Sequence, residues 1–149
     1  MDTKRISDKV AVGGQPSAEQ LAELHAQGFV TIVNLRTDGE KNQPLSPAAE
    51  KSEAAAAGLS YRHIPVSIAA LTAGQVEAVR AAIQGSEGPV YVHCGAGQRA
   101  CALSLLATEG DEDDEGTASA LTAKAGALGF PVVDDQLRVF IEDFTKSRT

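Results

Sequence analysis

Cysteine, aromatic residues and positive charge are all scarce in this chain of 149 residues. Its two cysteines, Cys94 and Cys101, are too few for a disulfide framework or a structural zinc site. Lys and Arg number 13 against 20 Asp and Glu, so the net charge is −7. An acidic chain is not attracted to nucleic acid or to an anionic membrane, so neither is an expected partner. An anionic substrate would need a local positive site.

Long apolar runs and metal-binding patterns are missing as well. No stretch approaches the roughly 20 apolar residues that span a bilayer. Residues 1–5 (MDTKR) are too polar for a secretory signal, so we expect a cytoplasmic protein. The histidines at 25, 63 and 93 lack metal-ligand spacing, and the acidic run 111–115 lacks the alternation of a calcium loop. We therefore expect no metal and no cofactor, and a solvated loop at 111–115.

The chain does contain a regular alternation of strand-like and helix-like segments. Short β-branched or apolar runs predict strands at 10–14, 29–35, 61–64 and 89–93. Capping residues predict helices that begin at Ser17, Ser46 and Thr72, and later helices at 99–108, 117–128 and 134–144. This alternation predicts an α/β fold in a single domain over residues 1–149, with a mainly parallel central sheet flanked by helices.

The segment from Tyr91 to Ala100 (YVHCGAGQRA) has the residues of an anion-binding loop. An apolar strand ends, a glycine-rich turn follows and a helix begins near Arg99. Ligands of open α/β sheets bind at the carboxyl ends of strands. A helix N-terminus there offers unpaired backbone N–H groups and the positive end of the helix dipole. Arg99 adds a planar fork of donors that suits a tetrahedral anion.

Cys94 is the predicted nucleophile of this loop. Two glycines allow the curvature that turns backbone N–H groups inward, and the same positive field favours the thiolate form of the cysteine. A buried core cysteine would explain Cys94 alone, but not the Gly and Arg residues beside it. The residues predicted to bind the substrate anion are Gly95, Ala96, Gly97, Gln98 and Arg99.

The motif His-Cys-x-Ala-Gly at 93–97 resembles the signature loop of protein tyrosine and dual-specificity phosphatases. Upstream motifs are similar to one bacterial branch, the phosphatase-like domain sometimes attached to β-lactamase-like hydrolases. They are Gly14-Gln15-Pro16, Asn34-Leu35-Arg36, Gly39-Glu40 and His63-Ile64-Pro65-Val66. The likeness covers about residues 4–108. It implies a dual-specificity-phosphatase-like fold and a phosphoric monoester hydrolase that forms a cysteinyl-phosphate. It also implies a phosphorylated small molecule or phosphoprotein as substrate, and a His93 that orders the loop from behind.

Two features depart from the phosphatase pattern. Four residues separate Cys94 from Arg99, one fewer than in the usual phosphatase loop, and this spacing also resembles the active loop of rhodaneses. Ala100 stands where phosphatases usually have a Ser or Thr that stabilises the departing thiolate. Two alternatives therefore stay open: a rhodanese-like sulfurtransferase that uses a Cys94 persulfide, and a phosphate-binding module with weak catalysis.

Phosphoryl transfer to cysteine needs a proton for the leaving oxygen. Dual-specificity phosphatases commonly supply an Asp two residues after a Pro-Val pair, but Ile68 stands at that position here. Asp38 and Glu40 are the candidate acids, because their loop should open at the same sheet edge as Cys94; a solvated turn is the alternative. Arg36 is either a second contact to the anion or a surface residue that pairs with Glu40. Without a well-placed acid, aryl phosphates would react better than alkyl ones.

Cys101 lies seven residues beyond Cys94 and is predicted to be a core residue. The alternative for Cys101 is a thiol that resolves an oxidised Cys94. The sequence specifies neither the oligomeric state nor which phosphorylated molecule is the substrate.

Overall fold

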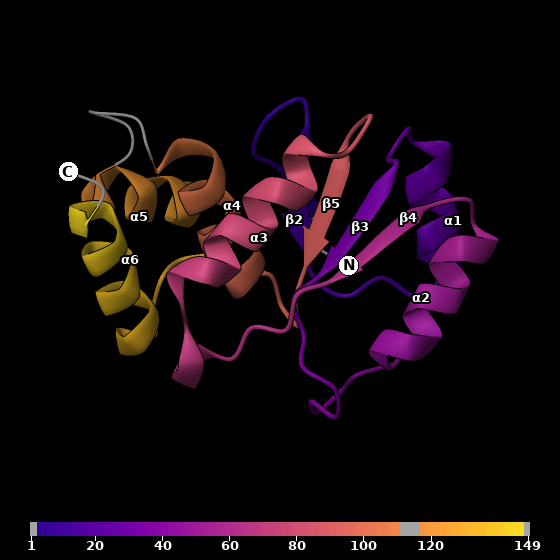
Figure 1. The fold of residues 1–149 in the computed structure, drawn as a ribbon, viewed down its shortest axis with the longest axis horizontal. Coiled ribbons are helices and arrows are strands. Elements are labelled where there is room, and N and C mark those ends of the chain that lie inside the picture. The colour runs from indigo at the N-terminus through magenta and orange to yellow at the C-terminus, as the bar shows by residue number, and fades with distance from the viewer. Residues whose placement is uncertain (1–2, 111–116, 148–149) are drawn as a thin grey trace.

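Five strands form one sheet in the order β1-β2-β5-β3-β4 in the computed structural model, which describes residues 3–110 and 117–147 (Figure 1). The strands are β1 (Thr3–Arg5), β2 (Val10–Gly13), β3 (Thr31–Asn34), β4 (Ser60–His63) and β5 (Val90–His93). Strand β1 pairs antiparallel with β2, and every other pairing is parallel. The prediction of an α/β fold with a mainly parallel sheet is confirmed.

All the predicted helices form, and their ends lie close to the predicted residues. They are α1 (Ala18–Ala26), α2 (Pro47–Ala56), α3 (Ala73–Gln84), α4 (Gln98–Glu109), α5 (Ala118–Ala127) and α6 (Asp135–Ser147), with a short 3-10 helix, η1 (Ile68–Ala70). Ser17 and Thr72 close capping boxes, as their spacing to a following Gln predicts. The side chain of Ser46 caps α2 by accepting a hydrogen bond from the backbone N–H of Ala49.

Strand β1 is an element that the sequence does not predict. It is only three residues long and polar (TKR), so it has neither the length nor the apolar alternation of a recognisable strand. Its place at the sheet edge comes from pairing with β2, where Lys4 lies opposite Val12. The predicted strand at 29–35 is also shorter, since only Thr31–Asn34 pairs in the sheet. The acidic run 111–115 lies outside the described residues.

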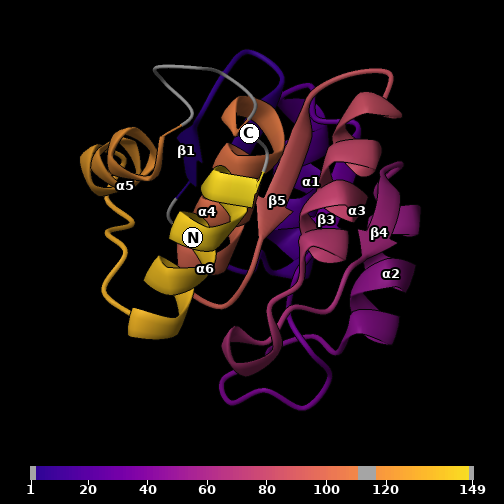
Figure 2. The same ribbon diagram turned by 60° about the vertical axis from the view of Figure 1, so that its left-hand side comes forward.

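Helices cover both faces of the sheet (Figure 2). Alternate strand residues such as Val12 and Val92 point to one face, where they pack in a cluster with residues of α3, α4, α5 and α6. Their neighbours Ala11 and Tyr91 point to the other face and pack with α1 and α2. Because both faces are covered, β2, β3 and β5 are fully buried, which explains why most of their residues are apolar.

The last residues of the four parallel strands lie side by side. The pairing register aligns Gly13 with His93, His93 with Asn34, and Asn34 with His63. The loops that follow these strands therefore leave the sheet at one edge, where open α/β sheets bind their ligands. This register brings the Cys94 loop next to the loop that contains Arg36 and Glu40.

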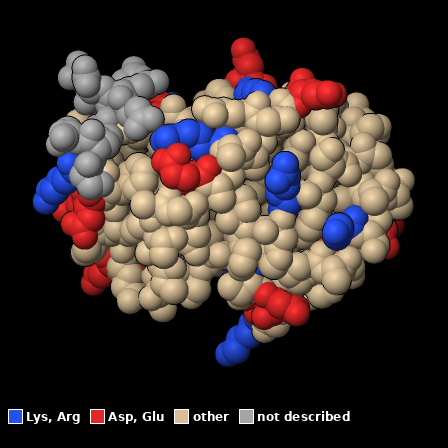
Figure 3. Space-filling view, in the orientation of Figure 1, with Lys and Arg blue, Asp and Glu red and all other residues tan. Residues whose placement is uncertain are grey.

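None of the helices within the described ranges is long and apolar enough to cross a membrane. On the face shown in Figure 3, Lys and Arg side chains are interspersed with Asp and Glu. The described cations on that face do not merge into a continuous basic patch.

Candidate active site

Cys94 lies directly after β5 and is buried, with 1% of its surface exposed. Its Sγ accepts a hydrogen bond from the backbone N–H of Gly97 at 3.1 Å. Gly97 is the N-cap of α4 and has a φ of +112°, which L side chains rarely adopt. A Cβ at this position would also overlap the ring of Phe130. Glycine is therefore required at position 97 for two reasons, the positive φ and the space taken by the Phe130 ring. The conformation of Gly97 directs its N–H group at the sulfur.

Gly95 lies against two guanidinium groups. A Cβ on Gly95 would be 3.6 Å from Nη2 of Arg36 and 3.6 Å from Nη2 of Arg99. A Cβ on Gly14 would be 3.0 Å from the carbonyl oxygen of Gly95, so the loop after β2 also approaches the Cys94 loop closely. The cysteine loop thus lies next to two positive charges, and the lack of a side chain on Gly14 allows the loop after β2 to approach it.

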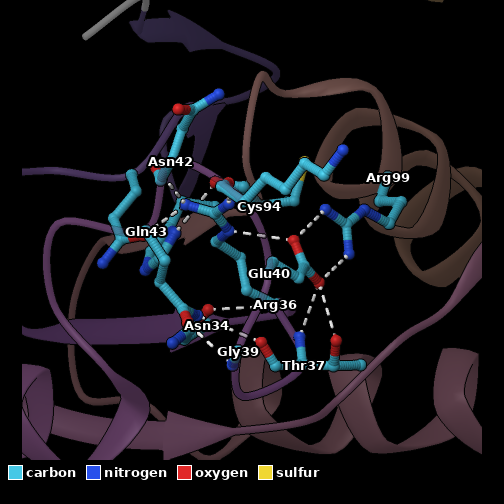
Figure 4. A network of polar contacts seen from close by, with 12 residues as sticks. Asn34, Arg36, Thr37, Gly39, Glu40, Asn42, Gln43, Cys94 and Arg99 are labelled. Atoms are coloured by element: carbon cyan, nitrogen blue, oxygen red, sulfur yellow. Dashed lines mark hydrogen bonds and ion pairs between the residues drawn. The ribbon is translucent and has the colours of Figure 1, made fainter.

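Arg99 is held by Glu40 from one end of its guanidinium (Figure 4). Its Nη1 donates to Glu40 Oε2 at 2.7 Å and to the carbonyl oxygen of Val66 at 2.8 Å, while Nη2 donates to Glu40 Oε1 at 2.8 Å. A guanidinium has five N–H donors. Glu40 and Val66 leave two of them, the Nε–H and the second Nη2–H, which lie on one edge and can bind two oxygens of a phosphate.

The charges of Arg99 and Glu40 stabilise each other. The hydrogen bonds that Arg99 donates to Glu40 raise the pKa of Arg99; burial opposes this rise, and Cys94 adds to it. Arg99 in turn holds the pKa of Glu40 well below its usual range, against the effect of burial and with help from the Thr37 N–H and Arg36. Glu40 is therefore a charged anchor for Arg99. The supply of a proton by Glu40 stays a prediction, and the low pKa argues against it, because a carboxylate held in this way favours its ionised form.

Arg36 is buried, with 4% of its surface exposed, so the interpretation as a surface residue is wrong. It does pair with Glu40, since its Nε lies 2.9 Å from Glu40 Oε1. Its Nη1 donates to Gln15 Oε1 at 2.6 Å and to the carbonyl oxygen of Asn42 at 3.2 Å, and its Nη2 donates to that of Lys41 at 2.7 Å. These bonds fix the loop and Glu40, and Nη2 lies 3.6 Å from the Cβ position of Gly95. The contact of Arg36 with the substrate anion stays a prediction.

His93 lies behind the cysteine and belongs to a buried polar network. Its Nε2 is 2.6 Å from Glu50 Oε2, and both side chains are completely buried. The other oxygen of Glu50 accepts a hydrogen bond from Gln15 Nε2 at 3.0 Å, and Gln15 Oε1 contacts Arg36. The network thus runs from behind Cys94 to the anchor of Arg99, which supports an ordering role for His93.

Glu50 and Gln15 are site residues that the sequence does not single out. Glu50 lies in the first turn of a helix rich in Ala, Glu and Lys, where an acidic residue is common on a solvated face. Only the docking of α2 against β5 makes it a buried partner of His93. Gln15 is part of the quoted Gly-Gln-Pro motif, but nothing in the motif assigns it a contact with Arg36.

Cys94 faces a pocket of about 290 Å³. The other lining residues are Ala96, Gln98 and Arg99 from the cysteine loop and α4, Ile68 from η1, and Pro131, Val133, Asp134 and Leu137 from the segment that leads into α6. Hydrocarbon side chains thus form much of the lining, and Arg99 connects the pocket to the charged network. Asp38, the other predicted acid, is exposed and does not line this pocket.

Cys101 is completely buried in the core, as predicted. Burial, together with the nearby Cys94, raises the pKa of its thiol to about 12. Within residues 3–110 and 117–147, no group of three or more His, Cys, Asp or Glu side chains is arranged to hold a metal ion.

Solved structures with this fold are protein tyrosine phosphatase-like proteins. A protein of the DUF442 family from Shewanella putrefaciens CN-32 superposes with a TM-score of 0.79 at 22% identity, covering 99% of this chain and 93% of that one. P. aeruginosa TpbA, solved in complex with pTyr, gives 0.70 at 16% identity over 99% and 90% of the two chains. PTPMT1, solved in complex with PI(5)P, gives 0.77 at 15% identity over 99% and 97%. At these identities the likeness shows the fold.

Sequence relatives define the family. Residues 2–110 match the family model described as "Beta-lactamase hydrolase-like protein, phosphatase-like domain". The β-lactamase hydrolase-like protein of Agrobacterium fabrum is 40% identical over 106 residues, and that of Xylella fastidiosa is 39% identical over 102 residues. These alignments cover 71% and 68% of this chain but 25% and 23% of the relatives, so the chain spans about a quarter of their length. The chain belongs to this phosphatase-like domain family, as its resemblance implied.

Proposed function

We propose that this protein is a cysteine-dependent phosphatase that hydrolyses phosphate monoesters through a cysteinyl-phosphate. The observation that carries the proposal is the pairing of Cys94 with Arg99 in one pocket. The sulfur accepts the Gly97 N–H at 3.1 Å, and Arg99 is fixed by Glu40 with one edge of its guanidinium left for an anion. The four-residue spacer brings Cys94 and Arg99 into one pocket, which supports phosphate binding by the short loop.

The geometry supports a two-step displacement. The Cys94 thiolate attacks phosphorus, the bond to the ester oxygen breaks, and the N-terminus of α4 with Arg99 stabilises the charge on the remaining oxygens. Water then attacks phosphorus, the sulfur–phosphorus bond breaks, and the electron pair returns to Sγ. Ala100 has no hydroxyl to assist this departure, but the Gly97 N–H already donates to the sulfur and can stabilise the leaving thiolate.

The pocket walls support aryl phosphates as the preferred substrates. Ile68, Pro131, Val133 and Leu137 offer hydrocarbon to the group attached to the phosphate, and Val133 is 76% exposed at the rim. The complexes of TpbA with pTyr and of PTPMT1 with PI(5)P are consistent with a phosphorylated ligand, of protein or small-molecule origin, in this fold. The net charge of −7 favours a ligand with a single phosphate over a polyphosphorylated one.

The test is to trap the intermediate. Acid quenching during turnover of an aryl phosphate, followed by peptide mass spectrometry, should find a phosphoryl group on Cys94. The Cys94→Ser variant should lose both the adduct and turnover while staying folded, whereas Cys101→Ala should keep both. Undiminished turnover in Cys94→Ser would contradict the proposal.

The same mass spectra test the sulfurtransferase alternative, which the four-residue spacing motivates. A gain of one sulfur on Cys94 after thiosulfate treatment, with no phosphate release from any aryl ester, would favour sulfur transfer. Phosphate binding in calorimetry without either product would favour an anion-binding module.

A further inference from the structure

The proposed reaction lacks a proton donor in the places where the sequence suggests one. Ile68 lines the Cys94 pocket at the position where related phosphatases carry an acid, and it has no proton to give. Glu40 is fixed as the charged partner of Arg99. Asp38 is exposed and lies outside the lining of the pocket. An alkoxide or phenoxide would therefore leave unaided unless another group reaches it.

Asp134 is the one carboxylate among the described residues that line the Cys94 pocket. It precedes α6, whose first turns face the carboxyl edge of the sheet near η1. Asp134 and Ile68 line the same cavity from different elements. A carboxyl group from α6 can thus take the place of the acid that is missing from η1.

The segment that carries Asp134 is anchored to the cysteine loop. Phe130 is 3% exposed, and its ring occupies the space that a side chain on Gly97 would need. Pro131 follows at once and lines the pocket, so the chain from 130 to 134 runs along its wall. The position of Asp134 therefore depends on contacts with the same loop that holds the nucleophile.

One carboxylate oxygen of Asp134 caps α6, and the other is not used in this cap. Oδ1 accepts a hydrogen bond from the backbone N–H of Leu137 at 3.0 Å, as in many helix N-caps. This bond fixes the side chain rotamer beside the pocket. Oδ2 makes no hydrogen bond to the described residues, so it can exchange a proton with a bound substrate or water.

We propose that Asp134 is the general acid and base of the phosphatase reaction, an inference that rests on the function proposed above. In the first step the protonated carboxyl donates its proton to the ester oxygen as the Cys94 sulfur bonds to phosphorus and the phosphorus–oxygen bond breaks. In the second step the Asp134 carboxylate accepts a proton from the water that attacks the cysteinyl-phosphate. The products are the alcohol and inorganic phosphate, and both side chains return to their initial states.

The test compares Asp134→Asn with Asp135→Asn on leaving groups of different basicity. Asn caps a helix about as well as Asp, so Asp134→Asn should keep α6. Asp135 is the matched control: it is the next residue, pairs with Arg138 at 2.6 Å and does not line the Cys94 pocket. The substrates are phenyl phosphate, whose phenoxide needs a proton, and 4-nitrophenyl phosphate, whose less basic leaving group does not.

Asp134→Asn should lower kcat for phenyl phosphate by about 100-fold or more, within the range for loss of a general acid, and that for 4-nitrophenyl phosphate by a much smaller factor. Asp135→Asn should leave both values near wild type. An equal loss on both substrates, or no loss, would overturn the role of Asp134 while leaving the phosphatase function intact. Absence of turnover by the wild-type protein on both esters would instead overturn the proposed function and this inference with it.

Discussion

Glu40 pairs with Arg99, Asp134 lines the pocket that contains Cys94 and Arg99, and the surroundings of these two carboxylates differ in almost every respect. Glu40 accepts hydrogen bonds from two guanidinium groups and from the backbone and hydroxyl of Thr37. Asp134 has no cationic partner among the described residues and accepts only a backbone N–H. A carboxyl surrounded by cations is favoured in its charged form, and Glu40 is held in this way. The division of work proposed for the two carboxylates therefore rests on their environments rather than on residue type.

The polar network around Glu40 and the lining of the Cys94 pocket differ in the same way. Behind Glu40 lies the buried network of Arg36, Gln15, Glu50 and His93, in which every charged side chain contacts a polar partner. Removing one member would leave a buried polar group or charge unpaired, at a cost of about 3–5 kcal/mol for an ion pair. The α6 wall is mainly hydrocarbon and more exposed. The polar network is thus suited to hold Arg99 rigidly, and the hydrocarbon lining beside α6 is suited to accept substrates of different shape.

The contact between Gly97 and Phe130 joins the Cys94 loop to the segment that leads into α6, and a side chain added there should have a large effect on stability. Gly97→Ala would place a Cβ at a φ of +112° and against the Phe130 ring. Strain and overpacking together should lower the free energy of unfolding by about 2–5 kcal/mol. Chemical denaturation checks this.

Gly126→Ala is the matched control for that measurement. Gly126 lies within α5 with open space around its Cβ position, so alanine should stabilise the helix by about 0.5–1 kcal/mol. Equal changes in the free energy of unfolding for Gly97→Ala and Gly126→Ala would show that the Gly97–Phe130 contact does not hold the Cys94 loop against the segment before α6.

Removing the charge of Glu40 should have a smaller effect on the free energy of unfolding, and this effect should depend on pH. Its pKa in the folded protein lies below the reference value of 4.5, so the unfolded chain binds the proton first as the pH falls. The stabilisation by Glu40 is therefore complete above that value and is lost as the pH falls toward the folded pKa. The difference in unfolding free energy between wild type and Glu40→Gln should be largest at neutral pH and shrink below pH 4.5. A difference that grows on acidification would contradict the fixed-charge role.

The sequence predicts the fold and the nucleophile loop well, because both depend on local patterns. Capping residues such as Ser17 and Thr72 mark helix starts, and the glycines around Cys94 mark the turn. The approach of the Arg36–Glu40 loop to the cysteine also follows from sequence, since parallel strands end at one edge. Those patterns suffice to predict the fold and the part of the site formed by the loops that follow the parallel strands.

The roles of the charged residues are not predictable in this way. Glu40 looks like a possible acid until its two arginine partners are seen, and Glu50 looks like a surface residue until α2 docks on His93. Asp134 is recognisable as a helix start, but it lies 40 residues after Cys94, and no local signal places α6 beside the pocket. Long-range packing decides all three cases.

The difference between the two carboxylates can be measured directly from the dependence of rate on the leaving group. A series of aryl phosphates of increasing leaving-group basicity should be hydrolysed by wild type, Glu40→Gln and Asp134→Asn. Glu40→Gln misplaces Arg99, so it should lower kcat/KM by about 10–100-fold and by a similar factor for every ester, with the slope against basicity unchanged. Asp134→Asn should make that slope steeper. A steeper slope in Glu40→Gln together with an unchanged slope in Asp134→Asn would contradict the account and return the proton donor to Glu40.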